Sequence, residues 1–390
     1  MSALLIKSFT LALTLAGVSL HSPVQQTAAE SNGQNKIPVL ETVDHFVPHI
    51  STVPASEGEE VELFVRERFL SEEGNSERCS NNKNRPVVLV VTGATLYAVP
   101  AFDVGFENYS WMSYLAENCF DVFAIEFTGY GLSPRPKMDD PCNASLDDQR
   151  NFLIPNPLEA PCAPSYSLPL ESFQTASDEM DTVVDYIRAL RGNDQLKINM
   201  IGWSRGGSRV IKYAAQRADR VDKVVLLAPG RLPPPPPAMA SLRVFDRAAE
   251  FASWDSQLDP TNCPDQFDAN IRDDIWTTIL NFDELGNSWG LSGISRTPGL
   301  SPDGWDSNFP GMVNAPALVI GGLLDNVVPP PQLETTYNQL GSTQKVLVKV
   351  TCGSHFVPWE RQHNVVLDAS VQWLLSGTYH GCSSGCTFVE

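Results

Sequence analysis

The sequence is poor in basic residues: 27 Lys and Arg against 46 Asp and Glu give the 390-residue chain a formal net charge of −19 at pH 7. Nucleic acids and anionic membranes are bound by basic surfaces, so this balance argues against both as partners. With 42% hydrophobic and 19% charged residues the chain is globular and can build a core. Its length fits one large domain with an insertion, or two ordinary domains.

An apolar stretch long enough to cross a bilayer as a helix is also lacking. The run Phe9–Leu20, which follows a single lysine, is too short to span and has the length of a signal-peptide core. Small residues at Thr27 and Ala29 offer a cleavage point, and a cut near Ser22 is an alternative. We interpret residues 1–29 as a signal peptide, with a membrane anchor as the alternative, and expect a secreted protein without a stable anchor.

Close cysteine doublets of the zinc-binding kind are absent, and the one tight spacing, "CSSGC" at the C-terminus, lacks partner histidines. We therefore expect no metal and no cofactor. An even number of cysteines in an exported chain predicts disulfides instead. The eight are Cys79, Cys119, Cys142, Cys162, Cys263, Cys352, Cys382 and Cys386. Two sequons, at Asn108 and Asn143, are possible glycosylation sites.

Short apolar runs rich in Val, Ile and Leu are typical of strands covered on both faces. They lie at 86–93, 121–127, 197–203, 223–229, 316–322 and 345–351. Helical patterns lie between and after them, with the clearest apolar stripe running from Phe173 to Leu190 and others at 110–119 and 364–375. Partly alternating runs at 42–53 and 59–70 predict an opening hairpin. This alternation predicts an α/β fold with a doubly wound, mostly parallel sheet.

Two segments interrupt the alternation. Residues 134–169 are rich in Pro, Asp and Cys and are interpreted as a long loop insertion. Residues 230–312 contain five consecutive prolines and four of the eight tryptophans, so we interpret them as an inserted cap. A structural subdomain with no ligand role is the alternative. The core would then be made of residues 30–229 and 313–390.

A strand that runs straight into "GWSRGG" and then into a helix raises the question of why Ser204 stands at that corner. A sharp strand-to-helix turn leaves no room for side chains two residues before and after its apex, so glycine is favoured there. The free N–H groups and the positive dipole end of the following helix point at the same place. This context indicates that Ser204 is a nucleophile whose attack creates an oxyanion.

Serine needs a base, and the base needs an orienting acid. Of the six histidines, His355 lies four residues beyond the strand ending at Thr351, where a parallel sheet exposes its functional loops. His363 is expected inside the last helix, and the others lie in the leader, the hairpin and the tail. Asp325 follows the preceding strand, and Asp246, within the cap, is a weaker alternative. The order Ser…Asp…His is the one that a serine elbow in this kind of sheet uses.

The oxyanion needs two donors. The backbone N–H of Arg205 is one, and the other is expected in the loop after the first core strand, from Ala94 or, as second choice, Thr95. A cation at a helix N-terminus opposes the dipole, so the Arg205 side chain indicates an acidic neighbour or an anionic ligand group, with a solvated arginine as the alternative.

Four motifs together resemble the α/β-hydrolase superfamily, and in particular its esterase- and lipase-like serine enzymes with a helical cap. They are "GWSRGG", "LLDNVVP", "CGSHFVPWE" and "FTGYGLSPRP". The resemblance covers roughly residues 86–136, 195–230 and 314–377, and Thr92-Gly93 stands where the family usually has His-Gly. It implies a serine hydrolase of an ester or lactone; the expected signal peptide adds secretion, and the tryptophans and prolines of the cap favour a small, largely apolar substrate. An acyltransferase or cyclase using the same triad, or a non-catalytic binding protein, are the alternatives.

The expected fold also suggests how the cysteines pair. The helix at 110–119 runs back from the carboxyl end of its strand, so Cys119 reaches the same edge of the sheet as Cys79, which precedes that strand. We therefore expect a Cys79–Cys119 bridge. Further bridges are expected to close the inserted loop, to close the tail and to tether the cap beside the base: Cys142–Cys162, Cys382–Cys386 and Cys263–Cys352.

Overall fold

The computed structural model describes residues 39–71, 79, 85–230 and 240–390. The signal peptide expected at 1–29 and the five-proline run lie outside these residues. Within them, nine strands form one sheet in the order β1-β2-β4-β3-β5-β6-β9-β10-β11. The strands are β1 (Leu40–Ile50), β2 (Glu60–Leu70), β3 (Val87–Val91), β4 (Asp121–Ile125), β5 (Ile198–Trp203), β6 (Val221–Leu227), β9 (Ala317–Gly322), β10 (Lys345–Val350) and β11 (Thr387–Val389).

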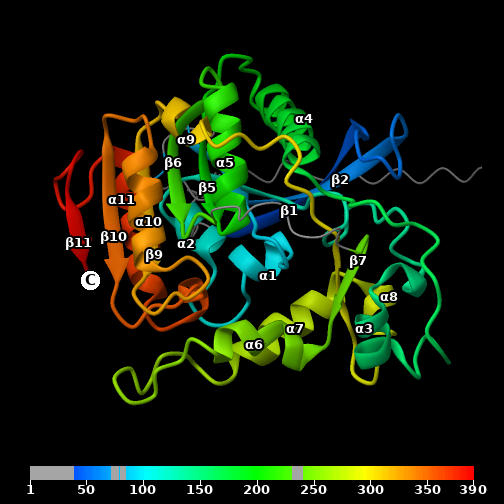
Figure 1. The fold of residues 1–390 in the computed structure, drawn as a ribbon. Coiled ribbons are helices and arrows are strands. Elements are labelled where there is room, and N and C mark those ends of the chain that lie inside the picture. The colour runs from blue at the N-terminus through cyan, green and yellow to red at the C-terminus, as the bar shows by residue number, and fades with distance from the viewer. Residues whose placement is uncertain (1–38, 72–78, 80–84, 231–239) are drawn as a thin grey trace, which may run out of the picture. The chain divides into compact units, whose positions relative to one another are not determined.

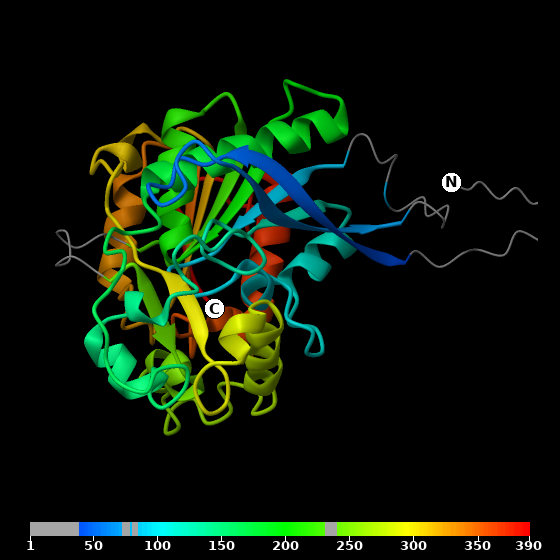
Figure 2. The ribbon, with the colours of Figure 1, turned by 90° about the vertical axis from the view of Figure 1, so that its right-hand side faces the viewer.

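All six apolar runs become strands of this sheet, and every residue of β3, β4, β5 and β9 is buried. From β4 to β11 neighbouring strands are parallel, whereas β1 and β2 form the expected antiparallel hairpin and β2 joins β4 antiparallel. Figure 2 shows this hairpin at one edge of the sheet. The predicted α/β class and mostly parallel sheet are confirmed.

Helices cover both faces of the sheet (Figures 1 and 2). On one side α2 (Trp111–Glu117) packs with α11 (His363–Ser376), and on the other lie α4 (Phe173–Arg191), α5 (Arg205–Gln216) and α10 (Pro330–Gln339). A capping box formed by Ser172 and Thr175 begins α4, and Gly192, with φ 62°, ends it. The apolar stripe of α4 is shorter than expected, because Leu190 is 44% exposed.

The segment 240–312, which we call the cap, contains a feature that its sequence does not signal. Besides the helices α6 (Arg247–Asp255), α7 (Ile271–Asn281) and α8 (Glu284–Asn287), it forms a separate antiparallel pair of strands, β7 (Leu242–Phe245) and β8 (Ser295–Pro298). Each strand has only four residues, and neither alternates clearly between apolar and polar side chains. In Figure 1 the arrowheads of β6 and β10 point toward α6 and α7, so the cap covers the carboxyl ends of the parallel strands.

Residues 134–169 are not a free loop. They fold into the short helical turns η2 (Pro141–Asn143), α3 (Leu146–Asp148) and η3 (Gln149–Leu153). These turns and the cap share a second hydrophobic core. Its buried members include Met138, Ala144, Leu153, Leu242, Val244, Trp289 and Ile294. The two insertions therefore pack against one another, although the sequence analysis treated them as separate segments.

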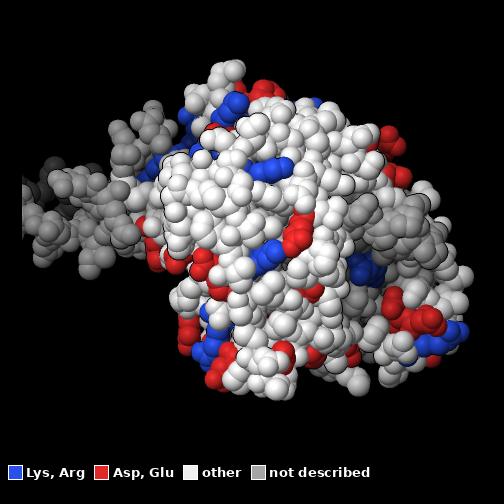
Figure 3. Space-filling model, turned by 60° about the vertical axis from the view of Figure 1, so that its left-hand side comes forward, with Lys and Arg blue, Asp and Glu red and all other residues white. Residues whose placement is uncertain are grey.

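The surface carries mixed charge. On the face shown in Figure 3, Lys and Arg side chains are interspersed with Asp and Glu on a largely uncharged surface. Neither sign forms a continuous patch among the described residues visible there. None of the helices in the described part of the chain is both long enough and apolar enough to span a membrane.

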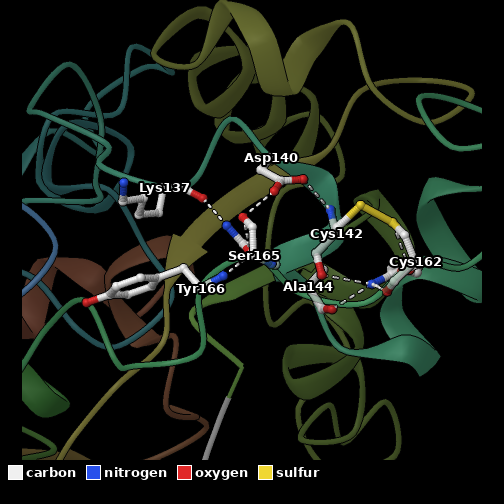
Figure 4. Close-up of a disulfide and its surroundings, with 9 residues drawn as sticks. Lys137, Asp140, Cys142, Ala144, Cys162, Ser165 and Tyr166 are labelled. Carbon is white, nitrogen blue, oxygen red and sulfur yellow. Dashed lines mark hydrogen bonds between the residues drawn. A yellow bond between two sulfur atoms is a disulfide. The ribbon is translucent and has the colours of Figure 1, made fainter.

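Four disulfides join the cysteines in the expected pairs: Cys79–Cys119, Cys142–Cys162, Cys263–Cys352 and Cys382–Cys386. The bridge between Cys142 and Cys162 closes the first insertion (Figure 4). The tail differs from expectation, because β11 follows the last bridge and adds a parallel strand to the edge of the sheet beside β10.

The two sequons differ sharply in accessibility. Asn108 is exposed. Asn143 is 1% exposed, and its amide nitrogen donates to the Lys137 carbonyl at 2.7 Å. Its Oδ1 accepts the backbone N–H groups of Ser165 and Tyr166, both at 2.9 Å; Figure 4 shows these partners. Burial of Asn143 disfavours a glycan there in the folded chain, so Asn108 is the more accessible of the two sequons.

Candidate active site

Ser204 stands at a sharp turn between β5 and α5 with a backbone φ of 58° and ψ of −124°. This left-handed φ is rare for a residue with a side chain, and such strain is concentrated at functional sites. A Cβ at Gly206 would lie 2.1 Å from the Val91 carbonyl oxygen, and one at Gly202 would lie 2.5 Å from that of Gly206. Both glycines are therefore required by close backbone approach, as the elbow motif predicts.

The loops after β9 and β10 bring Asp325 and His355 together. These strands are parallel neighbours, and Val350 pairs with Gly322 near their carboxyl ends. Oδ2 of Asp325 lies 2.8 Å from Nδ1 of His355, while Oδ1 accepts the N–H groups of Val327 and Val328 at 2.8 and 2.7 Å. A buried carboxylate at Nδ1 favours the tautomer that leaves Nε2 free as a base.

Asp246, the alternative candidate for the acid, lies at the start of α6 in the cap. It is the N-cap of α6, and its Oδ1 accepts the backbone N–H of Ala249 at 2.8 Å. Such a cap stabilises the first turn of a helix. His363, the other candidate histidine, is the first residue of α11 and stacks on Tyr109 with ring centroids 3.9 Å apart. Neither residue is in contact with the Asp325–His355 pair.

Ser204 and His355 line the same cavity, whose volume is about 280 Å³. Its walls are mainly apolar and include Leu96, Phe245 and Phe356, with Arg243 and Glu250 added from the cap. Among the described residues no hydrogen bond is formed by the Ser204 hydroxyl, so its proton is not yet committed to a partner. Catalytic hydrogen bonds commonly tighten only when substrate is bound.

The loop after β3 packs directly against the elbow. A Cβ at Gly93 would lie 3.3 Å from the Cβ of Ser204, and the next residues, Ala94 and Thr95, line the cavity. Arg205 is the first residue of α5, where backbone N–H groups have no partner within the helix. The two expected oxyanion donors, Ala94 and Arg205, thus belong to segments that flank Ser204; their catalytic role stays a prediction.

The side chain of Arg205 meets an acidic neighbour, one of the outcomes expected from the helix dipole. Its Nε donates to Oε2 of Glu171 at 3.0 Å, and Arg209 lies 3.1 Å from the same oxygen. Burial opposes the charge of Glu171, but the two guanidinium groups outweigh it and hold the pKa of this carboxyl below its ordinary value. All three side chains are buried, so the solvated-arginine alternative is wrong.

The same cluster also fixes the loop that stands where the family usually has His-Gly. Nη1 of Arg209 donates to the carbonyl oxygens of Thr92 at 2.6 Å and Gly93 at 3.2 Å. The Thr92 hydroxyl donates to the Leu96 carbonyl at 2.9 Å, closing the loop on itself. The elbow helix therefore positions the loop that precedes Ala94. Sequence reasoning missed Arg209, because nothing in its local pattern separates it from a surface arginine.

Residues of the cap hold the histidine loop from the other side. Oε1 of Gln257 accepts the backbone N–H of His355 at 3.0 Å and that of Asn326 at 3.2 Å. The buried carboxylate of Glu360 accepts Ser354 from the histidine loop and Trp254 and Gln266 from the cap. Burial raises the pKa of Glu360. One glutamine of the cap thus contacts the loops of both Asp325 and His355, a role that no sequence pattern signals.

The Cys263–Cys352 bridge links the cap to the same loop, three residues before His355. It spans 89 residues of sequence, whereas Cys382–Cys386 spans only 4. Cross-linking removes more conformational entropy from the unfolded chain when the closed loop is longer.

We expect Cys263→Ala/Cys352→Ala to lower the free energy of unfolding by about 3–5 kcal/mol, against about 2 kcal/mol for Cys382→Ala/Cys386→Ala. Guanidinium unfolding followed by fluorescence measures both losses, and the short-loop variant is the matched control. Because Cys352 adjoins the histidine loop, the first variant should also lose turnover while the second keeps it. An equal loss of stability in the two variants contradicts this account of the bridge.

No cluster of three or more His, Cys, Asp or Glu side chains that would suit a metal ion is present among the described residues.

The sequence and the fold of this chain are similar to those of known proteins. The family model described as alpha/beta hydrolase fold matches residues 86–362. Among curated proteins no match is found. A solved structure of a serine hydrolase involved in carbazole degradation is similar, with 16% identity, a TM-score of 0.50 and coverage of 87% of this chain and 100% of that one. A bromoperoxidase from Bacillus anthracis shows 15% identity, a TM-score of 0.50 and coverage of 85% and 99%. At these identities the solved structures support the fold, and the family model covers well over half of the sequence: the chain belongs to the α/β-hydrolase fold family.

Proposed function

We propose that the protein is a serine hydrolase that cleaves a carboxylic ester or lactone through an acyl-enzyme. The observation that carries the proposal is that Ser204, on its strained turn, shares one cavity with His355, whose Nδ1 lies 2.8 Å from Asp325. A nucleophile, a base and an acid that orients the base are the three parts that acyl transfer needs.

In this proposal Nε2 of His355 accepts the Ser204 proton as Oγ attacks the substrate carbonyl carbon. The backbone N–H groups of Ala94 and Arg205 stabilise the oxyanion, and one such donor is typically worth about 2–4 kcal/mol of barrier. His355 then gives its proton to the leaving alcohol. Water activated by the same imidazole releases the acid and restores the serine. Asp325 stabilises the imidazolium and keeps its proton on Nδ1.

The walls of the cavity support a small, largely apolar substrate, because Leu96, Phe245, Val327 and Phe356 all line it. Four disulfides support an oxidising compartment. We propose that residues 1–29 direct the chain to secretion and are removed, and that Asn108 is the sequon available for glycosylation. The cap is proposed to shape the substrate cavity.

The test is a panel of 4-nitrophenyl esters from acetate to decanoate and a set of lactones, assayed with and without added alcohols. We expect turnover of esters with release of the free acid. Formation of a new ester in preference to the acid would assign acyl transfer instead. Failure of the folded protein to turn over any ester or lactone contradicts the proposal and favours a binding protein on this fold.

A further inference from the structure

The guanidinium group of Arg243 lies in the cavity beside Ser204 and forms no salt bridge with any described residue; burial lowers its pKa, against the carboxyls of Glu250 and Asp148, which raise it. Arg243, on β7 of the cap, lines this cavity with Ser204 and His355. Within the described residues the Arg243 side chain forms one hydrogen bond, a long one of 3.3 Å from Nη1 to the Ala94 carbonyl. It makes one cation–π contact, with its guanidinium carbon 5.1 Å from the centre of the Phe245 ring. An arginine side chain has five N–H donors, so most of them have no protein acceptor here.

The acid that lines the cavity forms no salt bridge with this guanidinium. Glu250, on α6, also lines the cavity and is only 9% exposed. Its Oε2 and the hydroxyl of Ser295 on the neighbouring β8 are both buried and form no hydrogen bond of ordinary geometry, although Ser295 lies close enough to favour the ionised carboxyl. Burial raises the pKa of Glu250 to about 7, against Ser295 and Arg243, which lower it, so the carboxyl is mostly protonated below about pH 6 and mostly ionised above about pH 8. A protonated carboxyl is a hydrogen-bond donor rather than a counter-ion.

An unpaired cation among apolar walls is costly, because the surroundings solvate it far less well than water does. Leu96, Phe245 and Phe356 supply such walls in this cavity. A ligand carboxylate would supply the missing charge and accept two parallel hydrogen bonds from the planar guanidinium. The protonated Glu250 would at the same time offer a donor to a ligand oxygen.

We propose that Arg243 binds a carboxylate carried by the substrate, so that the enzyme acts on esters with one negative charge and an apolar body. This inference rests on the proposed hydrolase function and makes Arg243 its specificity-determining residue. The competing role for Arg243 is purely positional: its bond to the Ala94 carbonyl would hold the oxyanion loop. The two roles differ in what a substitution does to the choice between charged and neutral esters.

The experiment compares kcat/KM for matched esters. The 4-nitrophenyl monoesters of adipic and suberic acid carry a carboxylate on the acyl side and are compared with neutral 4-nitrophenyl hexanoate and octanoate. The ester 4-carboxyphenyl hexanoate carries a carboxylate on the alcohol side and is compared with neutral phenyl hexanoate. In the native protein we expect a preference of about 10- to 100-fold for the charged member on one of these sides.

Arg243→Met should abolish this preference and Arg243→Lys should keep part of it. Arg247→Met is the matched control, since Arg247 is exposed on α6, pairs with Asp273 and does not line the cavity; it should keep the native ratio. Glu250→Gln should also keep the preference in assays below about pH 6, where an amide replaces a neutral carboxyl.

Three results overturn the proposal: no preference for a charged ester on either side, an Arg243→Met variant that loses charged and neutral turnover in equal proportion, or a preference that emerges only in Glu250→Gln. The native protein decides the first even where a variant fails to fold. Turnover of neutral esters without charge preference removes this inference alone, whereas absence of all ester turnover removes the hydrolase proposal with it.

Discussion

Ser204→Ala is expected to lower kcat by about four to six decades while leaving the thermal midpoint nearly unchanged. The rate falls because no other side chain replaces the attacking oxygen; the residual rate comes from binding and from the oxyanion donors. Stability is kept because alanine can take the same backbone conformation, and no hydrogen bond of the Ser204 hydroxyl to a described residue is lost. Initial rates on a 4-nitrophenyl ester and a thermal melt followed by circular dichroism measure the two quantities.

Ser307→Ala is the matched control for this variant. Ser307 is exposed in the cap and lies away from the residues that line the cavity, so the same change of side chain there should leave both quantities at native values. If Ser204→Ala retains activity within tenfold of the native protein, the nucleophile is another residue.

The second large effect concerns the pair that activates the serine. His355→Ala should cost about six decades in kcat and Asp325→Asn about four, the asparagine because it no longer favours the required imidazole tautomer. Since the three side chains act as a unit, the double variant should be little slower than His355→Ala alone. Steady-state kcat values on one activated ester measure these losses for the two single variants and the double variant.

Asp246→Asn supplies the control, because this aspartate caps α6 and an asparagine side chain still accepts the Ala249 N–H. It should leave kcat unchanged. Losses that multiply in the double variant would show that Asp325 and His355 act separately, and a mild Asp325→Asn variant would show that His355 is oriented by another group.

The central sheet was predictable because its strands are continuous apolar runs buried on both faces. Composition alone marks such runs, as in "VVLVV" of β3. Three short strands could not be predicted: β7 and β8, with four residues each, and β11, with three. Strands this short show no periodicity in the sequence and form only where a neighbouring backbone offers pairing. Pairing of the insertion 134–169 with the cap depends on the second hydrophobic core, which no local pattern predicts.

The candidate site divides in the same way. Ser204, Asp325 and His355 follow strands, so the carboxyl ends of a parallel sheet predict that they meet. The acidic neighbour of Arg205 was foreseeable from the helix dipole, although its identity as Glu171 was not. Gln257, Arg243 and Glu250 were missed because they come from the cap. Their positions depend on how the insertion folds over the sheet, and an isolated glutamine or arginine in a sequence does not report this.

The cap covers the cavity and also contributes side chains that contact the Asp325 and His355 loops and line the cavity. Gln257 accepts N–H groups from the loops of both Asp325 and His355, the Cys263–Cys352 bridge joins the cap to the histidine loop, and Arg243 and Glu250 bring polar groups into the cavity. In the proposed mechanism, substrate choice and alignment of the base are consequently linked through one inserted segment, while the core of the fold sets the relative places of Ser204, Asp325 and His355.

The most direct test of Ser204 as the nucleophile is covalent labelling of the folded protein by a fluorophosphonate, followed by peptide mass spectrometry. The account predicts one adduct, on the peptide containing Ser204, which is absent from the Ser204→Ala variant, much slower to form in His355→Ala and lost when the native protein is unfolded before labelling. No adduct on the folded native protein, or an adduct on a different residue, would contradict the account.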